Sequence, residues 1–485
     1  MTNSNTKQST NYRALSTLVT VFFFWGFVAA SNDILIPVFK EKLNLTQGQA
    51  QLISLAFYIA YTVGSVIYYI ISKLIGEDIL NRIGYKNGIA LGLVISACGT
   101  LLFIPAANTV SFPLMISGLF IVALGFSLQQ TAANPLAITM GDSKKGAQRL
   151  SLAGGVNNVG TTIGPLLLSF AIFGSVAAAG TTSLSIENFK IPYLILGAAF
   201  LVVAVIFKFS SIPDKIVTVS DESTLISSTS DKKSALKYPQ LVLGMIAIFV
   251  YVGVEVSTAS NLPEFMKQHL NTPTDKIAPY ISLFWASLMI GRWTSSVGAF
   301  NIKGGTKAIM NFLMPYIAFA VFLGANKIAN NDITPFYIYS FVIIALIIGD
   351  MLSKGNPARQ LLLYSLFGIT ALMIGMLADG MVSVYAFISV GLFCSTLWPC
   401  IYTLAIAGLG KHTNQGSGFL IMMIMGGGII SYLQGVVSAD SLLGIQWSYL
   451  VGVACFGYLA FYAWKVTSIL KSQGIDYDNQ IGGGH

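Results

Sequence analysis

The sequence predicts an all-α polytopic membrane protein with fourteen transmembrane helices, arranged in two bundles. Only 9% of the 485 residues carry charge, 54% are hydrophobic, and the mean hydropathy is +0.72. Soluble domains carry charge on roughly a quarter of their residues, so a soluble fold of this composition could not cover its surface. The composition therefore excludes a soluble enzyme, a coiled coil and a disordered scaffold, and it indicates a surface that faces lipid.

Fourteen apolar segments are long enough, or nearly so, to cross about 30 Å of hydrocarbon at about 1.5 Å per residue. They lie at 14–39, 49–75, 87–106, 112–140, 150–179 and 191–209 in the first half, and at 241–266, 277–300, 307–323, 334–352, 360–378, 382–409, 416–437 and 447–469 in the second. We expect a six-helix bundle over 1–209 and a second bundle over 239–470. A polar linker at 210–238 joins them, and a tail follows at 471–485.

The distribution of basic residues predicts the orientation of the chain. With alternating spans, 21 of the 27 Lys and Arg residues fall on the side of the N-terminus and 6 on the other side. Basic loops are retained in the cytoplasm, so we expect both termini to be cytoplasmic and the protein to lie in an inner (plasma) membrane. This asymmetry explains the sequence pI of about 9.1 without a nucleic-acid partner. The first apolar run is too long for a cleaved signal peptide and is expected to be retained.

The two halves repeat the same order of features. Pro135, a basic loop at 144–149 and a glycine-bearing helix at 150–164 recur as Pro399, Lys411 and the glycine-bearing segment 416–428. Both copies run in the same direction relative to the predicted inside. Parallel halves joined by a cytoplasmic linker are typical of major facilitator transporters, in which a site near the midplane lies between the halves.

A short polar loop after the second span supports this interpretation. Residues 76–86, GEDILNRIGYK, resemble the inner loop between helices two and three of the major facilitator superfamily, although Asn81 stands where an acidic residue is usual. A fainter copy, Gly291-Arg292, lies at the inner end of the eighth span. The resemblance implies conformational or gating roles for Arg82, Gly84 and Arg292.

Longer motifs resemble the fucose:proton symporter family, whose relatives include bacterial glucose/galactose transporters. These motifs are WGF at 25–27 with Asn32-Asp33, QTAANP at 130–135, Asn157 with Gly160, VGVEVS at 252–257, GLF at 391–393 with Pro399, and GSG at 416–418. The resemblance implies a monosaccharide substrate. Gln130 occupies a position where the fucose transporter has a carboxylate and the glucose/galactose relatives have Gln, so glucose or galactose is expected ahead of fucose.

The family has twelve helices, and this chain departs from that number. Three spans lie between Gly291-Arg292 and Gly391, where the family has one. We therefore expect an extra helix pair within 305–380. The sequence leaves open which two of the three spans are inserted.

Two carboxylates within apolar spans are candidates for coupling a cation to transport. Asp33 and Glu255 lie well inside spans, where a charge costs at least about 2.5 to 3.5 kcal/mol. A desolvated carboxylate can bind a proton near neutral pH, or it can keep its charge by coordinating Na⁺. The alternatives are a snorkelling side chain for Asp33 and a structural ion pair or hydrogen bond for Glu255. Asp350 and Asp379 lie at span ends, where interfacial placement is expected.

Neutral polar and aromatic side chains supply the predicted substrate contacts. Amides both donate and accept hydrogen bonds, which suits sugar hydroxyls, and tryptophan can stack on a pyranose C–H face. The candidates are Trp25, Asn32, Gln130, Asn134, Asn157, Asn261 and Trp398. Hydrogen bonding between helices and interfacial tryptophan are the alternatives.

The resulting hypothesis is a monosaccharide importer that works by alternating access and symport of a proton or a sodium ion. We expect no metal and no cofactor apart from the coupling ion, because ATP motifs and Cys/His clusters are absent from the sequence. The partners are the sugar and the lipid bilayer, and the protein is expected to be monomeric. A sugar sensor with a transporter fold and an uncoupled facilitative carrier are the alternatives, and an enzyme is not expected.

Overall fold

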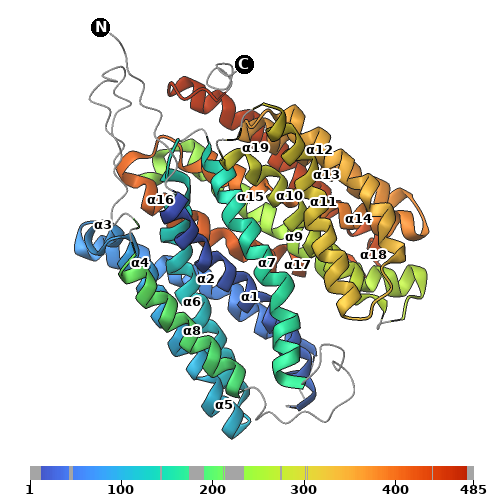
Figure 1. Cartoon of the computed structure of the whole chain (residues 1–485), viewed down its shortest axis with the longest axis horizontal. Helices are drawn as coiled ribbons and strands as arrows, with labels where there is room; N and C mark the ends of the chain where they lie inside the picture. The colour runs from blue at the N-terminus through green and yellow to red at the C-terminus, as the bar shows by residue number, and fades with distance from the viewer. Residues whose placement is uncertain are drawn as a thin grey trace.

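The structure is a computed structural model that describes residues 12–42, 47–142, 145–173, 190–210, 212, 234–273, 276–300, 302, 304–439 and 441–477. Within its helices, the side chains at 29–42, 47–54, 163–173, 190, 192 and 278 lie outside the described set. Helices connected by short turns make up this part of the chain, and no strand occurs in it (Figure 1). The all-α class is therefore confirmed for the described residues.

The first half of the chain contains the helices α1 to α8. Their bounds are α1 Tyr12–Lys42, α2 Gln47–Ile75, α3 Ile79–Ile83, α4 Tyr85–Leu101, α5 Phe103–Thr109, α6 Phe112–Thr139, α7 Gly146–Phe173 and α8 Lys190–Lys208. The third predicted span is divided into α4 and α5 at Leu102. The remaining predicted boundaries agree to within a few residues, and the predicted end of the fifth span, at 179, lies outside the described residues.

The second half contains α9 to α19. Their bounds are α9 Pro239–Leu270, α10 Ala278–Ser296, α11 Gly305–Ile328, α12 Tyr339–Ser353, α13 Pro357–Leu377, α14 Gly380–Cys394, α15 Leu397–Ile406, α16 Thr413–Met422, α17 Gly426–Val437, α18 Gly444–Trp447 and α19 Leu450–Ser472. Short 3-10 helices lie at Ala235–Lys237, Val297–Ala299, Thr334–Ile338, Gly410–His412 and Met423–Met425. Proline within the first turn helps to start α9 and α13, because its missing N–H is not needed there.

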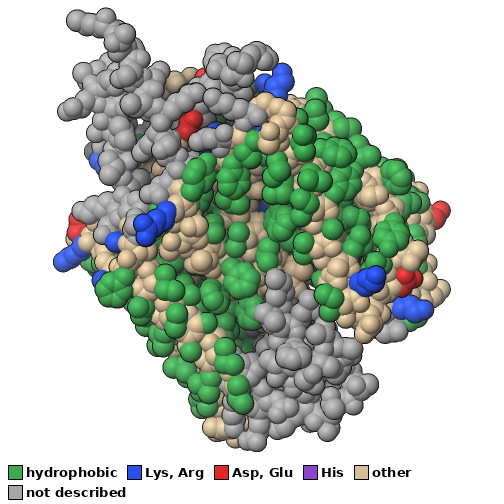
Figure 2. Space-filling view, in the orientation of Figure 1, with side chains coloured by type: hydrophobic (Ala, Val, Ile, Leu, Met, Phe, Trp, Pro, Cys, Tyr) green, Lys and Arg blue, Asp and Glu red, His purple; other side chains and the backbone are tan. Residues whose placement is uncertain are grey.

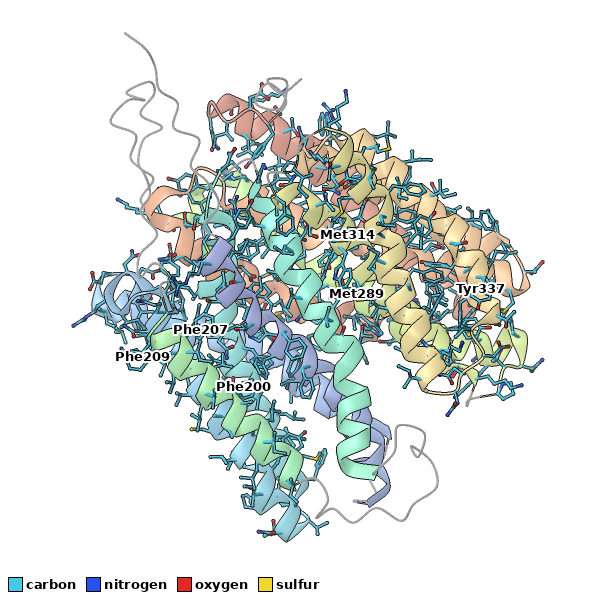
Figure 3. All side chains as sticks on the ribbon, in the orientation of Figure 1. Phe200, Phe207, Phe209, Met289, Met314 and Tyr337 are labelled. Atoms are coloured by element: carbon cyan, nitrogen blue, oxygen red, sulfur yellow. The ribbon has the colours of Figure 1, made fainter. Side chains whose placement is uncertain are left out.

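The outer surface of the molecule is apolar. Ten helices of the described chain are long and apolar enough to cross a membrane, so a multi-pass membrane protein is supported, and the count of fourteen spans stays a prediction. Figure 2 shows hydrophobic side chains covering the visible flank, with most charged side chains toward the two ends. On α8, Phe200 and Phe207 are fully buried, whereas Phe209 just beyond it is 83% exposed (Figure 3). Such exposure of a large apolar side chain suits a lipid surround.

Helix packing distinguishes the three segments between α10 and α14. In the first half, α4 packs mainly against α6 and α8. In the second half, α13 packs mainly against α14, α15 and α19. The helix α11 packs mainly on α10, and α12 contacts α11, α13 and α14. The helices α14 and α15, which lead to and carry Pro399, correspond to α6, which carries Pro135, and α19 corresponds to α8 as the last helix of its half. The helix α13 therefore has the same neighbours in its half as α4 has in the first half.

The two halves contact one another toward the end of the molecule at which α1 begins and α19 ends, here called the termini end. There α10 and the 3-10 helix Val297–Ala299 pack on α7, and α16 packs on α2 and α6. At the opposite end, α5 and α18 lie far apart (Figure 1). The polar residues of interest lie along this contact between the halves.

Candidate functional site

Two prolines free one backbone carbonyl in each half. Proline has no N–H and cannot bond the carbonyl four residues earlier, so Pro135 leaves the Thr131 oxygen free and Pro399 leaves the Ser395 oxygen free. A side chain replaces the missing donor in each case. Ser417 Oγ donates to the Thr131 oxygen at 2.7 Å, and Arg292 Nε donates to the Ser395 oxygen at 3.0 Å. The repeated prolines therefore create two polar attachment points within the apolar interior.

The second proline accompanies an interruption that the sequence analysis did not predict. Residues 382–409 were expected to form one span, but the helix breaks at Ser395-Thr396, between α14 and α15. Gly291 of α10 lies against this break, where an added Cβ would stand 1.8 Å from Ser395 Oγ. Only glycine permits this close approach, which brings the neighbouring Arg292 to the freed carbonyl.

Arg292 of α10 connects the two halves. Its Nη1 donates to Asn158 Oδ1 at 2.8 Å and lies 3.5 Å from the Gly154 oxygen, and both acceptors belong to α7. The adjacent Trp293 donates its indole N–H to the Gly155 oxygen at 3.2 Å. We call Arg292 and Asn158 the α7–α10 clasp. A charged donor makes this contact stronger than a neutral hydrogen bond.

Glu255 joins the clasp through a tyrosine one turn away on α9. The hydroxyl of Tyr251 donates to the Glu255 carboxylate, and Arg292 Nη2 lies 3.4 Å from the same hydroxyl oxygen. Arg292 also acts electrostatically on Glu255, and Cys394 of α14 lies nearby. The carboxylate therefore occupies the middle of α9 at one end of a network that reaches the first half.

A second polar chain crosses between the halves from Trp398. The rings of Trp398 and Tyr402 lie 5.8 Å apart, and the hydroxyl of Tyr402 bonds to Ser417 Oγ. Ser417 then reaches the Thr131 carbonyl of α6. Asn134 lies beside Tyr402, and its buried Nδ2 has no hydrogen-bond acceptor among the described residues. Trp398 also lies 6.3 Å from the ring of Tyr251, so the two chains are adjacent.

A third contact between the halves lies at the termini end. Asn414 of α16 donates through Nδ2 to Asn81 Oδ1 at 3.0 Å and to Asp78 at 3.3 Å. Tyr68 donates to the Asp78 carboxylate at 2.6 Å, and Tyr85 donates to Asn414 Oδ1. Burial raises the pKa of the Asp78 carboxyl above its ordinary value, and the surrounding donors oppose this rise. The loop therefore uses a carboxylate and amides to hold α16.

The predicted gating residues occupy different surroundings. Arg82 is exposed and lies 3.9 Å from Glu77, so it forms a surface pair within its own loop. Gly84 has φ of 84° between α3 and α4, in the region that favours glycine. Of the three, Arg292 is the one whose described side chain reaches the other half.

Several predicted substrate contacts form hydrogen bonds within the first half. Trp25 donates its indole N–H to Gln129 Oε1 at 2.8 Å. Gln130 Nε2 donates to Tyr61 Oη at 3.1 Å, and Asn157 Nδ2 donates to the Phe22 carbonyl at 2.9 Å. These contacts match the alternative of hydrogen bonding between helices, while Gln130 and Asn157 stay half-buried.

The remaining candidates lie apart from this network or outside the described side chains. Asn261 Nδ2 bonds to the Ser257 carbonyl on its own helix at 2.8 Å. Asn32 and Asp33 belong to α1, but their side chains lie outside the described residues. Their predicted roles are therefore not addressed by the geometry.

Several residues that make these polar contacts were not among the predicted candidates. Gln129, Asn158, Tyr251 and Asn414 make polar contacts that their neighbours do not make. A signal existed for Tyr251, because it lies four residues before Glu255 and shares its helix face. Gln129 and Asn158 are adjacent in the sequence to the predicted residues Gln130 and Asn157. Only the rotation of each helix decides which of the two neighbours makes a given contact.

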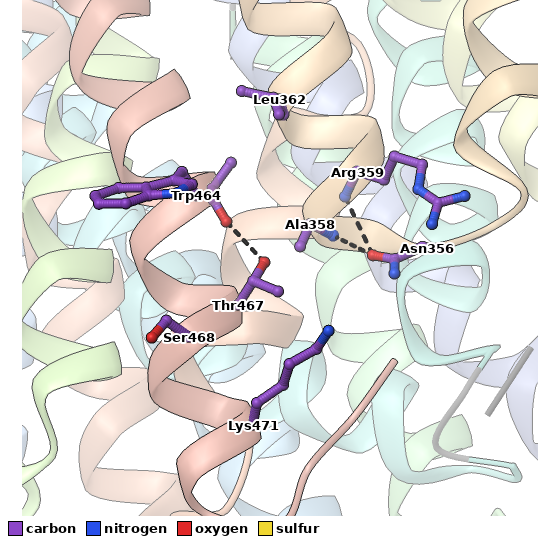
Figure 4. Close-up of a pocket in the computed structure, with 9 residues that line it drawn as sticks. Asn356, Ala358, Arg359, Leu362, Trp464, Thr467, Ser468 and Lys471 are labelled. Atoms are coloured by element: carbon purple, nitrogen blue, oxygen red, sulfur yellow. Dashed lines mark hydrogen bonds between the residues drawn. The ribbon is translucent and has the colours of Figure 1, made fainter. Parts of the chain in front are cut away.

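One cavity is separate from the contact between the halves. A cavity of about 480 Å³ lies between α13 and α19 and includes Arg359, Trp464 and Lys471 (Figure 4). Asn356 caps α13 there, because its Oδ1 accepts from the backbone N–H groups of Ala358 and Arg359. All of its lining residues belong to the second half. Within the described residues, no cluster of three His, Cys, Asp or Glu side chains is placed to hold a metal ion.

Comparisons with known proteins agree with this architecture. Residues 15–332 match the family model of the Major Facilitator Superfamily. A protein named glucose/galactose transporter from Brucella abortus biovar 1 (strain 9-941) is 34% identical, over 95% of each chain. The L-fucose-proton symporter of Escherichia coli (strain K12) is 26% identical, over 92% of this chain and 91% of its own.

A solved structure of similar fold is that of the Major Facilitator Superfamily transporter FucP in the outward conformation. It superposes with a TM-score of 0.69 and 25% identity, over 93% of this chain and 98% of its own. This likeness supports the resemblance to the fucose:proton symporter family that the motifs indicate. The family consists of transporters and not of enzymes. The chain therefore belongs to the Major Facilitator Superfamily.

Proposed function

We propose that this protein imports a monosaccharide, with glucose or galactose ahead of fucose, by symport with a proton or a sodium ion. Relatives named glucose/galactose transporter and L-fucose-proton symporter support sugar as the substrate class. The preference for glucose or galactose over fucose rests on Gln130, which bears an amide where the fucose transporter has a carboxylate.

The observation that carries this proposal is the network from Glu255 to the first half. A carboxylate within an apolar span is bonded to Tyr251, and the Tyr251 hydroxyl lies beside Arg292, which bonds to Asn158 of α7. Loading or unloading a cation at Glu255 changes the charge that Arg292 faces. The strength of the α7–α10 clasp then depends on the occupancy of Glu255, which links ion binding to the arrangement of the halves.

We propose Asp33 as a second coupling residue and Trp398, Asn134, Gln130 and Asn157 as residues of the sugar site. Trp398 and Asn134 flank the polar chain through Tyr402, which supports their placement near a ligand between the halves. One positive charge that moves through 100 mV supplies about 2.3 kcal/mol, which is enough for roughly fifty-fold accumulation. A single coupled ion would therefore suffice for scavenging.

We also propose fourteen spans, cytoplasmic termini and α11 with α12 as the inserted helix pair. The packing of α13 supports this choice, because its neighbours correspond to those of α4. With cytoplasmic termini, the halves meet on the cytoplasmic side, as in an outward-facing state. The domain limits of 1–209 and 239–470 and a monomeric state in the inner membrane complete the proposal.

Uptake by proteoliposomes tests the function. Purified protein is reconstituted, and uptake of labelled glucose, galactose and fucose is followed with an imposed proton gradient, an imposed sodium gradient, or neither. We expect one of the two gradients to drive accumulation of a hexose above its external concentration. Equal rates with and without both gradients would replace symport by facilitated diffusion, and absence of sugar uptake would contradict the substrate class.

A further inference from the structure

A polar cavity at the termini end is not used by the proposed transport site. Its volume is about 420 Å³, within the range of small-molecule sites. One wall comes from the first half, with Asp142, Lys145 and Gln148. The other wall comes from the second half and includes Lys307 of α11 together with Asp350 and Lys354 at the end of α12. The helices proposed as the inserted pair therefore build much of this cavity.

Close contacts between the halves hold the two walls together. Gln148 Nε2 donates to the Gly355 carbonyl at 3.2 Å, and Lys145 Nζ donates to the Phe300 carbonyl at 3.3 Å. An added Cβ at Gly298 would stand 2.7 Å from Gln148 Cγ, so glycine lets Gln148 lie against that surface. Because each wall belongs to a different half, the cavity exists only while the halves meet at the termini end.

The charges around the cavity favour an anion. Lys145, Lys307 and Lys354 bring three ammonium groups, against the two carboxylates of Asp142 and Asp350. Lys307 acts electrostatically on Asp350, which also accepts from Gln360 Nε2 at 3.3 Å. The net charge of the lining is therefore positive. Lysine ammonium groups are common partners of phosphate.

One buried acceptor among the lining residues lacks a donor in the described part of the chain, and a ligand hydroxyl group would supply one. Gln148 is 9% exposed, and its Oε1 has no hydrogen-bond donor among the described residues. The bond from Nε2 to Gly355 determines the orientation of the amide, so Oε1 is the atom left without a partner. An unsatisfied buried acceptor costs about 1 to 3 kcal/mol. A sugar hydroxyl could donate to it, whereas chloride or sulfate could not.

We propose that this cavity binds a hydroxylated phosphate monoester of the size of a hexose phosphate. The phosphate contacts the lysines, and a sugar hydroxyl donates to Gln148 Oε1. A ligand that needs both walls binds one conformation, so it stabilises the state in which the halves meet at the termini end. The cytoplasmic side of this site and its effect on uptake rest on the proposed function. On the cytoplasmic side, the ligand would be formed by phosphoryl transfer to the imported sugar. Its binding would stabilise the state in which the halves meet at the termini end and would therefore slow further import.

Binding to purified full-length protein tests this site without measuring transport. The probes are glucose 6-phosphate, inorganic phosphate and glucose, and the readouts are the melting temperature and the affinity from titration calorimetry. We expect glucose 6-phosphate to raise the melting temperature more than inorganic phosphate does at equal concentration. The exposed pair substitution Lys307→Gln/Lys354→Gln should weaken its binding at least tenfold. Lys465→Gln, which changes an exposed lysine of α19 outside the cavity, should leave it unchanged.

Gln148→Leu removes the acceptor and also the bond from Nε2 to Gly355, so inorganic phosphate is titrated against the same variant to measure the effect of losing that bond. Loss of the acceptor should bring the affinity for glucose 6-phosphate down to that for inorganic phosphate. Equal affinities of the two probes for the unmodified protein would overturn the assignment of a hydroxylated ligand. Equal binding of glucose 6-phosphate by the double lysine variant and the unmodified protein would overturn the site. Binding without any sugar transport would reject the proposed function and leave this site in place.

Discussion

Replacing Asn158 by alanine perturbs the α7–α10 clasp and leaves each half otherwise intact. The substitution removes the acceptor of Arg292 Nη1, which lies 2.8 Å away, and leaves Nη1 with the distant Gly154 oxygen at 3.5 Å. A hydrogen bond to a charged group contributes about 1.5 to 3 kcal/mol. Since the contact joins the halves, its loss should shift their equilibrium away from the state closed at the termini end by roughly ten- to 150-fold.

The neighbouring residue provides a matched control. Asn157 lies on the same helix, and its Nδ2 bonds to the Phe22 carbonyl within the first half at 2.9 Å. Asn157→Ala should therefore lower the stability of the first half by about 0.5 to 1.5 kcal/mol without changing the equilibrium between the halves.

Distances between spin labels measure this equilibrium. Labels at Lys73 of α2 and Lys411 before α16, both exposed, lie on opposite sides of the contact between the halves. Cys98, which is exposed, is first replaced by serine, because the other three free cysteines are buried. Asn158→Ala should increase the population with long distances, and Asn157→Ala should not. Identical distance distributions in the two variants would refute the role of the clasp.

Three further changes test separate parts of the account. Ser417→Ala leaves the Thr131 carbonyl without its donor. The population with long label distances should increase about five-fold if the bond contributes about 1 kcal/mol. An unchanged distance distribution would contradict a role for this bond in joining the halves. Gly291→Ala should lower the melting temperature, because overpacking against Ser395 costs about 1 to 3 kcal/mol. Gly457→Ala should not lower it, because no atom of the described residues lies within 4 Å of the new Cβ. Equal melting temperatures of the two variants would refute the close approach at Gly291. Burial raises the pKa of Asp78, so its stabilising contribution is fully present below the ordinary value of 3.8 and is lost as the pH rises through the raised value. The melting temperature of Asp78→Asn should therefore rise relative to that of the unmodified protein as the pH increases above 3.8. A difference in melting temperature that stays constant with pH would contradict this.

The sequence was sufficient for features that depend on composition and local order. Low charge and long apolar runs predict helices that face lipid, and the recurrence of Pro135 and Pro399 predicts matched positions in the two halves. Both prolines free carbonyls that polar side chains occupy. The position of Glu255 within an apolar run was enough to single it out, and the structure places it beside Tyr251.

Features that depend on helix rotation or on distant contacts could not be predicted. Successive residues on a helix point about 100° apart, so the sequence could not decide between Asn157 and Asn158. The break at Ser395 lies in contact with Gly291 and Arg292, which stand about a hundred residues earlier in the chain. The distinct packing of α13 likewise involves α19, far along the chain, and no local pattern reports it.

Glu255→Gln in proteoliposomes tests the proposed coupling of a cation to sugar movement at Glu255. The neutral amide keeps the size of the side chain and can still accept from Tyr251, so sugar binding and exchange should persist. We predict that the variant exchanges labelled for unlabelled hexose at close to the unmodified rate but no longer accumulates it under the cation gradient. Gradient-driven accumulation by Glu255→Gln equal to that of the unmodified protein would contradict the account.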